Sequence, residues 1–145
     1  MYGNTEKMAD YIARKLREFG VYKIKIFDAS KTHMSYIISE VWHNKALLLG
    51  SPTYNMDIHP ALKTFLDELR HLEDKNHIVG IFGSFTWNCN APKLIRQIIE
   101  QLKFELVYDP IEIRGAMKEA DAEKFDELAR LVAERILAMP DDVEY

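Results

Sequence analysis

The stretch ALLLGSPTYN, residues 46–55, decides the fold class of this protein. Its first four residues are aliphatic, and Gly50, Ser51 and Pro52 follow them directly. A short apolar run that ends at turn-forming residues is typical of a strand buried on both faces of a parallel sheet. Because the segments on both sides of this run favour helices, the stretch predicts an α/β protein.

Helical and strand-like periods alternate along the rest of the chain. Helices are predicted where apolar residues recur every three or four positions, at residues 5–19, 34–43, 60–72, 91–102 and 119–139. Strands are predicted at residues 21–27, 46–49, 77–82 and 104–113, the last interrupted by Pro110. This order predicts a parallel sheet with helices on both faces. In such sheets, ligands bind outside the carboxyl ends of the strands.

Composition excludes several classes of protein. The 145 residues suit a single domain, and 48% apolar with 29% charged residues is typical of a globular chain. A net charge of −4 argues against a nucleic-acid partner. No apolar run is long enough to span a membrane, and no signal peptide opens the chain, so we expect a cytoplasmic protein without membrane contact. The single cysteine, Cys89, excludes an internal disulfide framework.

The segment before the first predicted helix could bind a phosphate. Residues 1–6 read MYGNTE. Gly3 permits a close backbone approach, while Asn4 and Thr5 offer side-chain donors beside the free N–H groups of a helix start. An ordinary helix N-cap is the alternative interpretation of the same residues.

The loops after two predicted strands carry aromatic and uncharged polar residues. Residues 50–56 read GSPTYNM, and residues 83–89 read GSFTWNC. The alternatives are a surface turn for the first loop and a tryptophan that covers the core for the second. Together with residues 1–6, these loops suit a ligand with a phosphate at one end and a planar, polar-edged ring at the other. Among mononucleotides, FMN matches that description best.

The three loops resemble the FMN loops of flavodoxins and, more narrowly, those of the flavodoxin-like domain of flavodiiron proteins (A-type flavoproteins). The resemblance covers essentially the whole chain. It implies a flavodoxin-like three-layer sandwich with sheet order 2-1-3-4-5. It also implies a phosphate site at residues 1–5 and a flavin ring between residues 52–55 and 84–87, stacked on Trp87. The implied cofactor-binding residues are Met1, Tyr2, Gly3, Asn4, Thr5, Pro52, Thr53, Tyr54, Asn55, Ser84, Phe85, Thr86, Trp87 and Asn88.

By the same resemblance, the chain is an electron-transfer module. In the family, such a module passes single electrons from a rubredoxin-like donor to a diiron domain that reduces oxygen or nitric oxide; another acceptor is the alternative. The five histidines of this chain are dispersed, so we expect no metal site and no diiron domain in it. No catalytic residue is expected either, and oxidoreductase activity would require a partner or an upstream diiron domain.

One strand of the expected fold is missing from the sequence. A flavodoxin-like sheet has five strands with the first at its centre, whereas only four are predicted here. The strands at 21–27 and 46–49 would then each keep an unpaired edge. We therefore expect residues 1–145 to be one N-terminally truncated domain in which Met1 is an internal methionine. Strand exchange in a homodimer is the alternative.

Two other functions are consistent with the sequence. The first is a flavodoxin-fold NAD(P)H-dependent reductase of FMN or quinones, which is disfavoured because no arginine cluster suits a nicotinamide nucleotide. The second is a remnant of the fold that does not bind FMN. A phosphoacceptor receiver is disfavoured because Gly50 and Ser51 stand where an aspartate would be required.

Overall fold

The computed structural model describes residues 2–29, 31–44, 46–54, 57–58, 60–70, 77–85, 91–102 and 104–138. The helices are α1 (Tyr2–Glu18), α2 (Met34–His43), α3 (Pro60–Leu69), α4 (Ala91–Leu102) and α5 (Glu119–Ala138). The strands are β1 (Ala46–Tyr54), β2 (Asp57–Ile58), β3 (Ile78–Phe85), β4 (Glu105–Leu106) and β5 (Ile111–Arg114).

The sheet is built around a long parallel pair. β1 and β3 are in register from Ala46 opposite Ile78 to Pro52 opposite Ser84. On its other side, β3 pairs in parallel with β4 near its start and with β5 near its end. β4 and β5 together form the predicted strand at 104–113, and Pro110 lies in the interruption between them, as expected. The short β2 adds an antiparallel pair at the end of β1, within the predicted loop.

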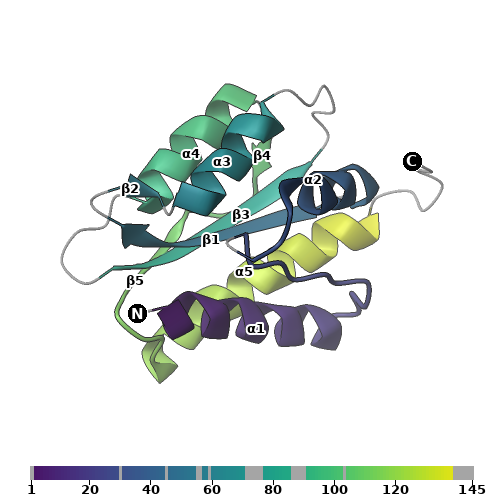
Figure 1. Ribbon diagram of the computed structural model, residues 1–145. Coiled ribbons are helices and arrows are strands. Elements are labelled where there is room, and N and C mark those ends of the chain that lie inside the picture. The colour runs from purple at the N-terminus through teal and green to yellow at the C-terminus, as the bar shows by residue number, and fades with distance from the viewer. Residues whose placement is uncertain are drawn as a thin grey trace.

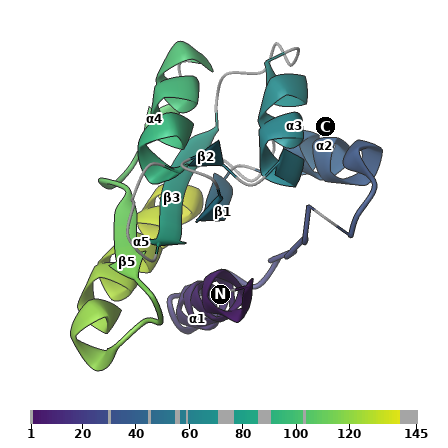
Figure 2. The same ribbon diagram turned by 60° about the vertical axis from the view of Figure 1, so that its left-hand side comes forward.

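Helices cover both faces of the sheet in three layers (Figure 1). α1 and α5 pack together on one face, while α3 and α4 lie on the other, with α2 beside α3 (Figure 2). Each face has its own apolar core. Phe65, Leu66 and Ile95 are fully buried on the α3–α4 face, and Met8 and Phe125 are fully buried on the α1–α5 face. The predicted α/β sandwich is therefore confirmed.

The helix predictions agree with the structure within a few residues. The helices at 34–43 and 91–102 have the predicted bounds. α1 stops before Gly20, as predicted. The φ of Gly20 is +101°, which suits a residue without a side chain, and the Val21 N–H donates to the Leu16 carbonyl at 2.9 Å. However, α1 begins at Tyr2 rather than at Thr5, so residues 2–4 form a helical turn instead of a loop.

The prediction of a strand at residues 21–27 is wrong. Residues 21–28 belong to no strand of the described sheet. Their alternating apolar pattern is that of a strand, but a strand forms only when a neighbour accepts its backbone hydrogen bonds. The described part of the chain brings no such neighbour to them, and Tyr22 and Ile26 remain 76% and 51% exposed.

Candidate functional site

The predicted cofactor segments meet at the carboxyl ends of β1 and β3. The start of α1 lies beside this edge, because the Thr5 hydroxyl lies 3.3 Å from the Ser84 hydroxyl near the end of β3. This hydrogen bond joins residues 79 positions apart in the sequence. Residues from the first and third predicted loops are therefore neighbours in space.

The serines at this edge are buried hydroxyls on adjacent strands. Ser84 is 2% exposed and Ser51 is fully buried. Ser51 stands opposite Gly83 in the parallel register, and Pro52 stands opposite Ser84. A methyl group added to Gly83 would lie 2.6 Å from the Ser51 carbonyl oxygen, which shows that the two backbones approach closely. Glycine at this position keeps the strand ends together.

The start of α1 carries the partial positive charge of a helix N-terminus. Its first turn holds no acidic residue, so no carboxylate within that turn opposes this charge. Three predicted phosphate residues, Tyr2, Gly3 and Asn4, lie in this first turn, and Thr5 follows them. The turn contributes backbone N–H groups, and Thr5 contributes a half-buried hydroxyl.

The remaining predicted site residues divide into two groups. The last three residues of β1 are Pro52, Thr53 and Tyr54, and the last residue of β3 is Phe85. The prediction that these positions lie in loops is therefore wrong. Strand pairing continues past the apolar runs because the β1–β3 register extends to Pro52 and Ser84, and β2 pairs with Thr53 and Tyr54. Met1, Asn55, Thr86, Trp87 and Asn88 lie outside the described residues.

Sequence reasoning missed the contribution of β5 to this edge. Gly115 follows β5, and its N–H donates to the Phe85 carbonyl at 2.8 Å, which holds the end of β3 in place. Gly115 has a φ of +72°, a conformation that favours glycine. The sequence signal available for this turn was Gly115 itself. A glycine can indicate a turn, but it does not indicate that the turn contacts Phe85, 30 positions earlier.

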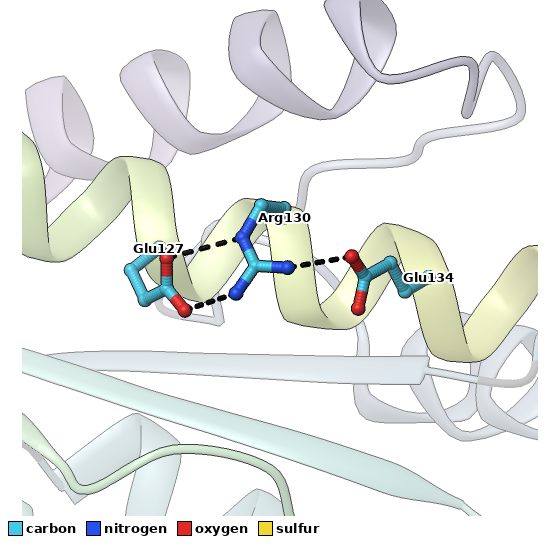
Figure 3. A network of polar contacts seen from close by, with 3 residues as sticks. All are labelled: Glu127, Arg130 and Glu134. Carbon is cyan, nitrogen blue, oxygen red and sulfur yellow. Dashed lines mark hydrogen bonds and ion pairs between the residues drawn. The ribbon is translucent and has the colours of Figure 1, made fainter.

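The shifted titratable groups lie away from the carboxyl edge, on α1 and α5. On the exposed surface of α5, Arg130 contacts both Glu127 and Glu134 (Figure 3). Its hydrogen bonds lower the pKa of Glu127, and the same bonds raise the pKa of Arg130 above its ordinary value. These exposed groups form ion pairs within one helix. Their pKa shifts therefore reflect surface ion pairing and do not indicate a functional site.

Other described features bear on the remaining expectations. His77 is buried at the amino end of β3, where its Nε2 lies 2.7 Å from the Val41 carbonyl oxygen, so it is a structural residue. Among the described residues, no group of three or more histidine, cysteine, aspartate or glutamate side chains could hold a metal ion. In that same part of the chain, no helix has the length and apolar character of a membrane span.

Comparison with known proteins identifies relatives for the whole described fold. The flavodoxin family model matches residues 1–130. Rubredoxin-oxygen oxidoreductase of Megalodesulfovibrio gigas is 30% identical over 138 residues, which cover 95% of this chain and 34% of that protein. Nitric oxide reductase of Moorella thermoacetica is 33% identical over 137 residues, covering 94% of this chain and 34% of that protein.

Solved structures give the same result. Rubredoxin oxygen:oxidoreductase from Desulfovibrio gigas superposes with a TM-score of 0.90 at 30% identity, over 95% of this chain and 34% of that one. A flavodoxin from the domain Archaea superposes with a TM-score of 0.81 at 23% identity, over 94% and 93% of the two chains. The chain thus spans about a third of the flavodiiron-type relatives. The chain belongs to the flavodoxin family, and it is homologous to the flavodoxin-like part of flavodiiron proteins.

Proposed function

We propose that this chain binds FMN at the carboxyl edge of β1 and β3 and acts as an electron-transfer module. Flavodoxins are FMN proteins. The observation that carries the assignment to this edge is the 3.3 Å contact between Thr5 and Ser84, which joins the phosphate segment to the ring segment. When bound, FMN supplies one-electron redox chemistry.

The donor set at this edge fits a phosphate monoester. The first turn of α1 offers free backbone N–H groups and no acidic side chain, and the Thr5 and Ser84 hydroxyls lie beside one another. Such uncharged donors at a helix N-terminus bind an anion without a lysine or arginine. The residues in the last part of β1 and Phe85 at the end of β3 would flank the ring, because both strands end at the same edge.

The partners are proposed from the relatives. The curated relatives are about three times as long as the matched segment, and one is named a rubredoxin-oxygen oxidoreductase. We propose a rubredoxin-type donor and a diiron domain as acceptor, with another redox protein as the alternative acceptor. The activity of those whole proteins would then require regions outside residues 1–145.

A matched pair of threonine variants tests the site. Thr5→Val removes the hydroxyl beside Ser84, and we expect it to weaken FMN binding at least about tenfold, because one hydrogen bond to a charged group contributes about 1.5–3 kcal/mol. The control is Thr64→Val, which makes the same chemical change at an exposed position whose hydroxyl bonds only within α3. Binding is measured by quenching of flavin fluorescence, with riboflavin beside FMN.

The riboflavin comparison identifies the phosphate contribution. Riboflavin lacks the phosphate, so Thr5→Val should weaken its binding much less than that of FMN. Equal losses for both flavins would place Thr5 outside the phosphate site, and an absence of FMN binding by the unaltered chain would contradict the proposal. Steady oxidation of NADH by the FMN-loaded protein in the presence of a quinone would favour the reductase instead.

A further inference from the structure

Within the described sheet, the last residue of β3 pairs with β5 and not with β1. The register between β3 and β1 ends at Ser84, whereas the register between β3 and β5 continues to Phe85, which stands opposite Arg114. Directly after this pair, the Gly115 N–H donates to the Phe85 carbonyl oxygen at 2.8 Å. In Figure 2, β5 lies beside β3 along this stretch. The position of the Phe85 backbone therefore depends on the turn that follows β5.

The turn after β5 is anchored at its far end, where α5 begins. The Lys118 N–H donates to Asp121 Oδ2 at 3.0 Å, and the Asp121 N–H donates to the Lys118 carbonyl oxygen at 2.9 Å. Hydrogen bonds of this kind at a helix start fix the direction in which the chain enters the helix. The half-buried Met117 packs against the core on the α1–α5 face. The turn is thus a fixed support for the end of β3.

The backbone conformation at position 115 requires glycine, although the space around it does not. The φ of Gly115 is +72°, a value that residues with a side chain adopt only at a cost. A methyl group added there would meet no atom within 4 Å. Alanine at this position would therefore fit the space but oppose the turn that directs the N–H toward Phe85. Asparagine adopts this conformation more readily than alanine does.

Phe85 lies where the two parts of the proposed flavin site meet. The preceding residue, Ser84, contacts the Thr5 hydroxyl at 3.3 Å on the phosphate side. Phe85 itself ends β3 on the side proposed to flank the ring. A change at Gly115 would therefore reach the ring side of the site through the Phe85 backbone, whereas a change at Thr5 would reach the phosphate side.

We propose that Gly115 is a positioning residue for the flavin ring. Its N–H fixes the Phe85 carbonyl, and the anchored turn thereby keeps the end of β3 in the place where the ring is flanked. Gly115 acts through Phe85 and not by contact with the flavin. This inference rests on the FMN site proposed above, and it adds a residue of β5's turn to a site otherwise built from α1, β1 and β3.

Gly115→Ala in the whole chain tests this role. We expect it to weaken the binding of FMN and of riboflavin by the same factor, at least about fivefold, because one backbone hydrogen bond supports the ring side and both ligands carry the same ring. Binding is measured by quenching of flavin fluorescence. Gly115→Asn should restore both affinities to within about twofold of the unaltered chain, since asparagine tolerates the positive φ.

Gly20→Ala is the matched control. Gly20 also has a positive φ, +101°, and a methyl group there would come no closer than 3.8 Å to Leu137, which is an ordinary contact. Gly20 follows the last turn of α1, whereas Thr5 lies at the start of that helix. We therefore expect Gly20→Ala to destabilise the fold as Gly115→Ala does, but to leave both flavin affinities unaltered.

Amide exchange provides a measurement that needs no flavin. In Gly115→Ala, the amide at position 115 should exchange at least about fivefold faster by NMR, because its acceptor is lost, while those of Ile78 and Val79 at the start of β3 stay unaltered. If Gly115→Ala does not fold by circular dichroism, Asp121→Ala replaces it. That variant releases the far end of the turn and should weaken both flavins at least about twofold.

Three results would overturn the inference and leave the FMN site intact. The first is that Gly115→Ala, or its replacement Asp121→Ala, binds both flavins as tightly as the unaltered chain. The second is an equal loss of affinity in Gly20→Ala, which would indicate a general loss of stability. The third is a loss for FMN alone, which would place the effect on the phosphate side. An unaltered chain that binds neither flavin would overturn the proposed function, and this inference with it.

Discussion

Gly83 and Gly50 lie on adjacent parallel strands at positions where neighbouring atoms leave no room for a methyl group. At Gly83 the obstacles are the Ser51 carbonyl oxygen at 2.6 Å and the Pro92 ring at 3.0 Å, so they include backbone. At Gly50 the obstacle is the Phe82 ring, which is a side chain. A backbone obstacle cannot move without disturbing the β1–β3 ladder, whereas a side chain can be replaced.

This difference predicts separable effects. Gly83→Ala should lower the free energy of unfolding by about 1–3 kcal/mol, the usual cost of overpacking. Gly50→Ala should cost less in a Phe82→Leu background than in the wild type, whereas the cost of Gly83→Ala should be the same in both. Urea unfolding of the single and double variants measures these differences. A cost of Gly83→Ala that disappears with Phe82→Leu would contradict the backbone explanation.

At the scale of elements, residues 21–27 lie outside the described sheet and make few backbone hydrogen bonds. Within this segment, the backbone donors with an identified backbone acceptor are Val21 and Ile24, and no residue joins the sheet. Local opening requires little free energy where few hydrogen bonds and apolar contacts must break. We therefore expect the amides of residues 22, 23 and 25–27 to exchange orders of magnitude faster than those of β3. Protection equal to that of β3 in hydrogen-exchange mass spectrometry would mean that another strand already pairs with this segment.

A tyrosine–carboxylate hydrogen bond joins α1 to α5. The Tyr11 hydroxyl donates to Asp126 Oδ1 at 2.6 Å, and its ring contacts Phe125 edge-on. This hydrogen bond raises the pKa of Tyr11 above its ordinary value of 10.0, and burial and the charge of Asp126 act in the same direction. The folded state therefore holds the hydroxyl proton more tightly than the unfolded chain does.

The raised pKa of Tyr11 makes the stability of the fold depend on pH. A raised pKa means that the stabilisation is fully present below about pH 10 and is lost as the pH rises through the folded-state pKa. Tyr11→Phe should therefore be less stable than the wild type at pH 8, and the difference should shrink above pH 10 in urea unfolding. Tyr22→Phe removes the same hydroxyl at an exposed position and serves as the control, with very little change in the free energy of unfolding expected at pH 8.

At the scale of the whole molecule, the sheet separates two cores that share few side chains. Ile95 is fully buried in the core on the α3–α4 face, and Ile111 is 2% exposed in the core on the α1–α5 face. Because the two residues belong to different clusters, their substitutions should act independently. Ile95→Val and Ile111→Val should each lower the free energy of unfolding by about 0.5–1.5 kcal/mol.

The double variant measures the independence of the two cores. Its loss of stability should equal the sum of the single losses within about 0.5 kcal/mol, whereas Ile26→Val at a half-exposed site should change stability very little. Urea unfolding followed by circular dichroism provides all four values. A coupling well above that margin would show that the sheet transmits strain between its faces, and the description of two separate cores would then be wrong.

The helices and the apolar parts of β1 and β3 could be predicted from the sequence because local patterns specify them. Three- and four-residue spacing of apolar side chains is a property of one segment, so α2 and α4 have the predicted bounds. The same holds for the apolar run at 46–49, whose residues pack against the cores on both faces of the sheet. The segments expected to bind the cofactor also rest on a local signal, a glycine, hydroxyl and amide pattern before a helix or after a strand, and they stay a prediction.

Only the tertiary structure decided which of these segments pair with or contact another segment of the chain. Residues 21–27 carry a strand pattern, but strand formation depends on a neighbour that can come from anywhere in the chain. Strands β1 and β3 extend past their apolar runs because each supplies the other with hydrogen-bonding groups as far as Pro52 and Ser84. The contact between Thr5 and Ser84 likewise depends on how α1 packs against the sheet, since no local pattern encodes a separation of 79 residues.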